Sequence, residues 1–453
     1  MKKITLLSAI LICSTLIHAQ TNPAILSWLQ NDIIMGRHYV SGNYTPIQDA
    51  VLANVQTVQY SVDWVYASTK GIPTYITGPF LDGNPSTASN QNAIFKFPLN
   101  PVQNTGTPVN TTGGNIGIFI NGVALFDYRD GVSWKNSTGT LAGGPFGGMG
   151  DGVWNRDAIV AEKSGFDCAK GHPAMGNYHH HQNPSAFNLD LIVISNVCNL
   201  YAADGLYVID STKHSPLIGF AYDGFPIYGA YAYKNADGTG DIVRMKSSYS
   251  LRSISTRTTY SDGTVVTAGP DLTATYPLGY FREDYYYNSV LDSTDDFLDE
   301  HNGRFCITPE YPNGIYCYFA TVDVNWNSSY PYVIGKTFYG TKVASKVSSI
   351  TETVTTYSPS TTGIQTKKFE SMHINIFPNP SNDLLAIQLS DINKNNIDVT
   401  LYDLTGKPID KTKVYQGSTI AYFDTKRLYS GEYFVVVSNE SSSVIKKVIV
   451  TKE

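Results

Sequence analysis

Residues 118–127 read Ile118-Phe119-Ile120-Asn121-Gly122-Val123-Ala124-Leu125-Phe126-Asp127. Two short apolar runs flank the dipeptide Asn121-Gly122, which is typical of a two-residue β-hairpin turn because both positions tolerate a positive φ. The chain as a whole is rich in Tyr, Thr, Val, Ile, Gly, Asn and Pro, which are strand and turn residues, and strong helix patterns are scarce. We therefore predict a mainly β protein.

Other segments extend this prediction. Residues His214 to Gly229 predict a strand, a turn at Asp223-Gly224 and a second short strand, and residues Asp299 to Phe319 predict another hairpin. The run from Thr57 to Val65 is strand-like, whereas Ala24 to Asn31 is the one short segment that favours a helix.

The first residues predict a signal peptide covering residues 1–19. Met1-Lys2-Lys3 is basic, the run from Ile4 to Ile17 is apolar, and Ala19 is a small residue before the expected cut. No later apolar run is long enough to span a bilayer, so we expect no transmembrane segment. The formal net charge of −6 argues against a nucleic-acid partner, which requires a basic face.

Four cysteines remain once Cys13 leaves with the leader: Cys168, Cys198, Cys306 and Cys317. An even number of cysteines in an exported chain favours disulfides. We predict Cys168 with Cys198 and Cys306 with Cys317, because each pair is nearest in sequence. Four cysteines allow three connectivities, and a cysteine-containing metal site is the alternative.

Histidines cluster in Gly171-His172-Pro173-Ala174-Met175-Gly176-Asn177-Tyr178-His179-His180-His181, which holds four of the nine in the chain. Residues two apart on a strand point to the same face, so His179 and His181 can reach one ion together. His172 can join them across the turn. Possible fourth ligands, each beside a predicted turn, are His214, Asp223 and His301. Three imidazoles with an open position suit one transition metal, copper or zinc. The alternative is that these histidines are structural.

A composition change divides the chain. We predict one large β-rich domain over residues 20–344, a Ser/Thr-rich linker over 345–371 and a small domain over 372–453. The last segment contains Phe377-Pro378-Asn379-Pro380, then Leu401-Tyr402-Asp403-Leu404-Thr405-Gly406-Lys407, then Leu428-Tyr429-Ser430-Gly431-Glu432-Tyr433. It resembles the C-terminal sorting domain of the type IX secretion system of Bacteroidetes. The resemblance implies a β-sandwich, handling by that secretion machinery, and a secreted or cell-surface location.

The large domain resembles the YHYH-domain family of secreted proteins. The matching segments, in the family's order, are Asn121-Gly122-Val123, the histidine-rich segment, residues 214–229, residues 298–314 and residues 330–335. Here the naming tetrapeptide is Tyr178-His179-His180-His181, with His180 where the second Tyr is expected. On a strand His180 faces away from its two neighbours. The resemblance therefore implies a β-rich exported domain without assigning it a reaction.

The leading hypothesis is a secreted, surface-directed protein with a histidine-based metal site. The second hypothesis is a non-catalytic extracellular adhesion or binding module with structural histidines. Abundant Tyr suits a surface that stacks on an extracellular polymer or ligand, and suits a buried β core equally well.

Overall fold

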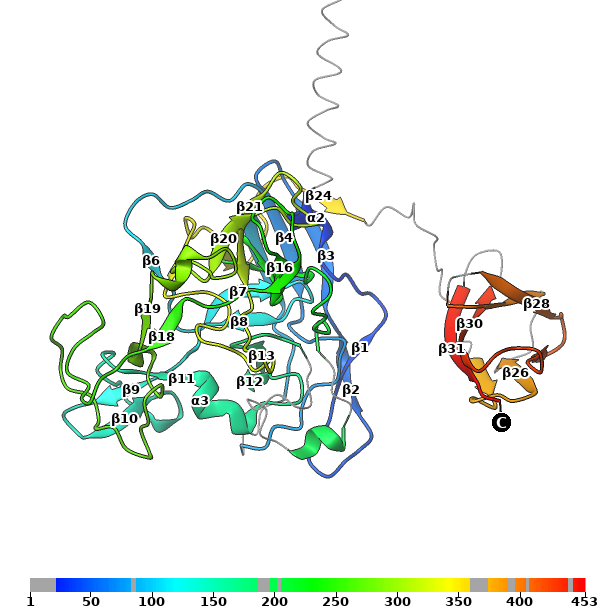
Figure 1. Ribbon diagram of the computed structural model, residues 1–453, viewed down its shortest axis with the longest axis horizontal. Coiled ribbons are helices and arrows are strands. Elements are labelled where there is room, and N and C mark those ends of the chain that lie inside the picture. The colour runs from blue at the N-terminus through cyan, green and yellow to red at the C-terminus, as the bar shows by residue number, and fades with distance from the viewer. Residues whose placement is uncertain are drawn as a thin grey trace, which may run out of the picture. The chain divides into compact units, whose positions relative to one another are not determined.

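The computed structural model describes residues 22–82, 87–185, 196–201, 205–358, 374–389, 396–404, 407–438 and 443–452 (Figure 1). The predicted signal peptide, residues 1–19, lies outside this range. The chain divides into two compact units, Met1–Ser358 and Pro359–Glu453, which are described separately. No helix in the described part of the chain is long and apolar enough to cross a membrane.

The largest sheet of the first unit has eight strands and contains the predicted hairpins. In spatial order they are β12 (His172–Ala174), β13 (Asn177–His180), β8 (Ala124–Phe126), β7 (Asn115–Phe119), β14 (Leu217–Ala221), β15 (Pro226–Tyr228), β21 (Ile315–Phe319) and β20 (Gly303–Cys306). The pairs β13–β8 and β15–β21 are parallel, and the other neighbours are antiparallel. The turns at Asn121-Gly122 and Asp223-Gly224 join β7 to β8 and β14 to β15, which confirms both predicted hairpins.

A second sheet has five strands. They are β23 (Ser345–Val347), β5 (Ala93–Pro98), β4 (Trp64–Thr69), β3 (Val55–Tyr60) and β24 (Thr355–Tyr357). The predicted strand Thr57 to Val65 covers the end of β3, the turn at residues 61–63 and the start of β4. The predicted linker began too early, because β23 and β24 pair with β5 and β3. Ser, Thr and Val suit edge strands whose pairing partner comes from elsewhere in the chain. The rest of that predicted linker, from residue 359, lies outside the described residues.

The smaller elements of this unit lie around the two sheets. They are β1 (Met35–His38) with β2 (Ile47–Leu52), β6 (Val109–Asn110) with β22 (Thr337–Phe338), β9 (Arg129–Lys135) between β10 (Thr140–Gly143) and β11 (Asn155–Asp157), β16 (Tyr231–Tyr233) with β17 (Ile242–Arg244), β18 (Tyr249–Leu251) with β19 (Tyr285–Tyr287), and the short helices α2 (Pro23–Leu26) and α3 (Ala158–Glu162). The predicted helix over Ala24 to Asn31 is only the single turn α2.

The main core joins the two large sheets. The ring centroids of Phe97 in β5 and Phe220 in β14 lie 6.2 Å apart. Trp28, next to α2, packs on both rings, with centroid distances of 5.9 Å to Phe97 and 5.4 Å to Phe220. All three are almost completely buried. Burial of aromatic surface between the sheets therefore stabilises this unit.

The second unit is a small β-sandwich. One sheet holds β25 (Ile374–Phe377), β26 (Leu384–Leu389) and β29 (Ile420–Asp424), and the other holds β28 (Pro408–Val414), β27 (Ile397–Tyr402), β30 (Gly431–Ser438) and β31 (Ser443–Val450). Alternate residues of β30, Tyr433, Val435 and Val437, point into one apolar core. The predicted small β domain is confirmed.

The structure joins Cys168 to Cys198 by a disulfide. It does not join Cys306 to Cys317, which are both buried free thiols, so the second predicted disulfide is absent. Across the β20–β21 pair Cys306 lies opposite Ile315 and Cys317 opposite Arg304, so the two cysteines are diagonal neighbours. Proximity in sequence placed them on one hairpin but did not fix this offset register.

Removing an aromatic ring from the main core should destabilise the first unit. We expect Phe220→Ala to lower its free energy of unfolding by roughly 3–5 kcal/mol, since it deletes a fully buried ring. The control is Phe305→Ala. The Phe305 side chain is 60% exposed, so this substitution should lower the free energy of unfolding much less. Denaturant unfolding followed by tryptophan fluorescence reports this unit, because all five Trp precede residue 359. Equal losses for the two variants would contradict this description of the core.

Candidate metal centre

The histidine-rich segment forms the β12–β13 hairpin. Its two turn residues, Met175 and Gly176, have φ of 49° and 83°, and two consecutive positive φ angles match the twist of a tight hairpin. An added Cβ at Gly176 would lie 2.0 Å from Ser89 Oγ, so glycine is required there. With this turn the register places His172 directly opposite His179.

The alternation of the strand separates the three consecutive histidines. His179 and His181 point to the face that also carries His172, as predicted. His180 points to the other face, where its Nε2 lies 2.7 Å from the Tyr75 hydroxyl. Burial lowers the pKa of His180 to about 3, so it is a neutral core residue.

His172, His179 and His181 converge. One ring nitrogen of each lies within 4.8 Å of those of the other two, and His179 Nε2 and His181 Nε2 are only 3.1 Å apart. The three residues are 6%, 2% and 3% exposed, respectively. Tetrahedral zinc with Zn–N bonds near 2.0–2.1 Å places its ligand nitrogens roughly 3.3 Å apart. The predicted set therefore meets at a spacing close to that of metal ligands.

Backbone carbonyls orient two of these rings. His179 Nδ1 lies 2.8 Å from the carbonyl oxygen of Asn177, and His181 Nδ1 lies 2.6 Å from that of Asp127. A carbonyl oxygen only accepts, so each Nδ1 must carry the proton that it donates. In a neutral ring the Nε2 lone pair is then free, and in this structure the two Nε2 atoms face each other.

Glu162, the last residue of α3, lies at the same point. Its Oε2 is 3.3 Å from His172 Nε2 and 3.4 Å from His181 Nε2. In the described residues neither ring nitrogen of His172 makes a hydrogen bond of good geometry. The Glu162 side chain is 22% exposed, against 8% and 2% for those of His172 and His181, so the cluster is nearest to solvent on this side.

The protonation of the cluster is uneven. Burial and the neighbouring imidazoles hold the pKa of His179 well below its usual range. Burial alone would lower the pKa of His181, but its contact with Glu162 outweighs this and raises that pKa. Burial opposes ionisation of Glu162, yet its contacts with His172 and His181 keep the pKa of this carboxyl below its usual range. Without a metal, the positive charge of the cluster is therefore on the His181 side, next to Glu162.

Aromatic rings enclose the imidazoles. Phe126 of β8 stacks on His179 with 3.8 Å between ring centroids, and the Phe166 ring meets His172 edge-on at 4.9 Å. Both rings exclude water, which strengthens electrostatic interactions inside the cluster.

The three predicted fourth ligands are not members of this cluster. His214 Nδ1 contacts the Ser215 carbonyl, Asp223 accepts a hydrogen bond from Tyr318, and His301 Nδ1 contacts Thr337. Each of these residues instead makes hydrogen bonds within its own part of the fold. The residue that sequence reasoning missed is Glu162, which lies before the histidine segment on a helix of only five residues. The one local signal is Asp157, whose carboxylate caps that helix by accepting from Ile159 N at 2.8 Å.

The family comparisons match these two units. The model of the YHYH protein family covers residues 94–331, and that of the secretion system C-terminal sorting domain covers residues 375–451. The chain belongs to the YHYH protein family. The sorting domain marks it for export, to the cell surface or the medium. A search of the curated proteins found no match.

The protonation pattern can be measured in the metal-free protein. We expect ¹⁵N NMR of histidine-labelled chain to show His179 neutral, with its proton on Nδ1, across the range in which free imidazole titrates. His181 should stay charged to a higher pH than free imidazole, because its pKa is raised. A neutral His181 at pH 6 would contradict the ion pair with Glu162.

The two faces of the strand can be separated by substitution. We expect His180→Phe to lower the free energy of unfolding by roughly 1–3 kcal/mol, because it leaves the Tyr75 hydroxyl without this partner. The ¹⁵N shifts of His179 and His181 should stay unchanged, since their rings lie on the other face. A change in those shifts as large as that caused by Glu162→Gln would refute the separation.

Proposed function

We propose that this exported protein binds one transition metal ion, zinc or copper, through His172, His179 and His181. Glu162 is the fourth group, as a direct ligand or as an acceptor beside the ion. The observation that carries the proposal is the opposition of His179 Nε2 and His181 Nε2 at 3.1 Å while both Nδ1 atoms contact carbonyl oxygens. Two lone pairs cannot face each other at this distance unless a cation lies between them.

That cation is a proton or a metal ion, and the rest of the site favours the metal. A proton shared by two rings would not account for His172, a third buried ring whose nitrogens lack well-formed hydrogen bonds in the described residues. The carboxylate within 3.4 Å of two of the rings would pair with a protonated His181 and would also complete the donor set of a metal ion. Three neutral imidazoles and a carboxylate are a common donor set for zinc and also suit copper.

The carbonyl contacts of His179 and His181 support the same proposal. Metal-bound histidines usually donate their other ring N–H to a carbonyl or carboxylate, which fixes the tautomer and the ring orientation. Here Asn177 and Asp127 supply such acceptors from the backbone. Asn177 belongs to β13 and Asp127 follows the last residue of β8, so both acceptors are backbone groups positioned by the sheet.

Metal analysis tests the proposal directly. We expect the exported chain, purified without a histidine tag or metal-affinity step, to contain about one zinc or copper ion by elemental mass spectrometry. His179→Ala/His181→Ala should abolish this content, whereas His214→Ala, a histidine outside the cluster, should retain it. An unchanged metal content in the double variant would refute the proposal.

Chelation gives a second readout. A ligand present at about 1,000 times its Kd stabilises the folded state by roughly 4 kcal/mol, so removing the ion should lower the melting temperature. The double variant should melt at the same temperature with and without chelator. A wild-type chain that contains no metal and melts identically in chelator would instead support an extracellular binding module with structural histidines.

A further inference from the structure

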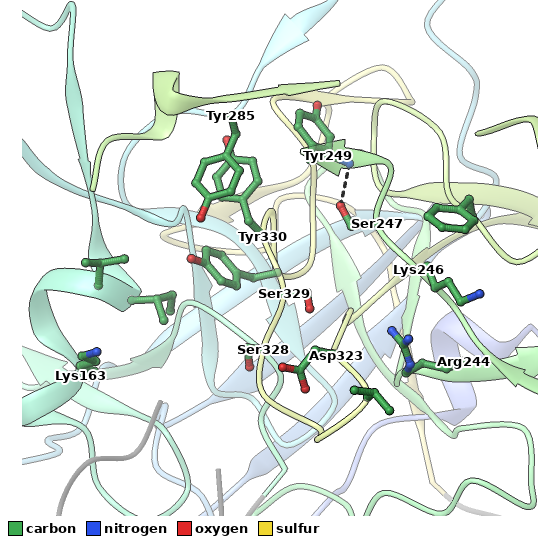
Figure 2. A pocket seen from close by; sticks show the side chains of 15 residues that line it. Lys163, Arg244, Lys246, Ser247, Tyr249, Tyr285, Asp323, Ser328, Ser329 and Tyr330 are labelled. Carbon is green, nitrogen blue, oxygen red and sulfur yellow. Dashed lines mark hydrogen bonds between the residues drawn. The ribbon is translucent and has the colours of Figure 1, made fainter. Parts of the chain in front are cut away.

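A separate pocket lies beside helix α3. It has a volume of about 610 Å³, and part of its wall is Ile159, Val160 and Lys163, from α3 and the residue that follows it. Figure 2 shows Lys163 at one side and Arg244 and Lys246 at the other. No residue of the histidine cluster lines it.

The pocket is basic although the chain is acidic. Lys163, Arg244 and Lys246 line it against one carboxylate, Asp323, whereas the whole chain has a formal charge of −6. Among the residues that the structure describes, Lys163 has no ion-pair or hydrogen-bond partner. Lys246 pairs with Asp296 and is 35% exposed, so its charge also remains accessible to solvent. The local excess of positive charge favours an anionic ligand.

Tyrosine rings form another wall of this pocket. Tyr285 and Tyr330 stack with centroids 3.9 Å apart and an interplanar angle of 4°, and Tyr249 meets Tyr330 edge-on at 5.4 Å (Figure 2). The hydroxyls of Tyr249 and Tyr330 donate to neighbouring protein oxygens. Their positions are therefore fixed. Tyr330 is only 8% exposed, whereas Tyr249 and Tyr285 are half-buried, so these two rings present the surface that a ligand meets, which suits the C–H face of a sugar.

The same tyrosines also line a second pocket of about 210 Å³. Tyr249, Tyr285 and Tyr330 are shared. Arg282 and Lys336 line it together with two carboxylates, Glu283 and Glu300, and Arg282 Nε lies 3.5 Å from Glu283 Oε1. Arg282 is only 8% exposed, and its Nη1 has no hydrogen-bond partner in the described residues. A buried guanidinium nitrogen without an acceptor is costly, and a ligand carboxylate would satisfy it.

We propose that the two pockets form one binding site for an acidic oligosaccharide, a chain of uronic acid sugars. Sugar rings contact the tyrosine wall, one carboxylate lies near Lys163 and Lys246, and another lies near Arg282 and Lys336. The export signal supports this ligand class, because acidic polysaccharides are extracellular polymers that a surface protein meets. The site is distinct from the metal centre and does not depend on it.

Calorimetric titration of the full exported chain tests this site. The probes are tetramers of galacturonate, glucuronate and mannuronate, with maltotetraose as the neutral control. We expect at least one uronate tetramer to bind, more weakly as salt is raised, and maltotetraose not to bind. No binding by any uronate tetramer, or equal binding by maltotetraose or by an oligoglutamate peptide, would overturn the proposal.

Charge reversal locates the site. Lys163→Glu and Lys336→Glu should each weaken uronate binding about tenfold or more, which corresponds to roughly 1.4 kcal/mol. Lys213→Glu is the matched control, because Lys213 is 78% exposed and lines neither pocket. Metal content should be unchanged in all three variants, so that failure of this proposal and failure of the metal centre remain distinguishable. Equal affinity of the Lys163 and Lys213 variants would place the ligand elsewhere.

Discussion

The parallel pairing of β13 with β8 is the constraint on which the histidine cluster depends. It sets His179 opposite Ala124 and His180 opposite Leu125, so that His181 meets the carbonyl of Asp127 just beyond the end of β8. A slip of one residue would move His179 and His181 to the face that now holds His180. The register therefore determines which imidazoles meet, which tautomers they take, and whether a cation fits between them.

Burying such a cluster is unfavourable unless its charges and lone pairs are matched. In the described structure Glu162 balances the charge near His181, and two backbone carbonyls take the Nδ1 protons. The groups that still lack a matching partner are the two opposed Nε2 atoms of His179 and His181 and the ring nitrogens of His172. A bound ion would correct both at once, which is why the local stability of this hairpin and the binding of metal are expected to be linked.

The features that depend on neighbouring residues in the sequence were predicted, whereas those that depend on contacts between distant segments were missed. The hairpin at Asn121-Gly122 and the alternation at His179 and His181 follow from local sequence and strand geometry, and the structure has both, although only Gly122 of the dipeptide takes a positive φ, of 82°. Glu162 could not be found, because a five-residue helix carries no periodic signal and its approach to the hairpin is set by packing. The offset of Cys306 and Cys317 is likewise a matter of strand register, which spacing along the chain does not determine.

The short helix α3 explains how the two proposed sites can be neighbours and yet independent. Asp157 fixes its start by accepting hydrogen bonds from the backbone and from the Tyr332 hydroxyl at 2.8 Å, and burial raises the pKa of that carboxyl to about 7. Glu162 leaves the helix toward the imidazoles, while Lys163, one residue later, lines the basic pocket. Successive residues of a helix project about 100° apart, so these opposite charges are directed to different ligands. A fixed helix start would let each side chain meet its own proposed ligand without moving the other.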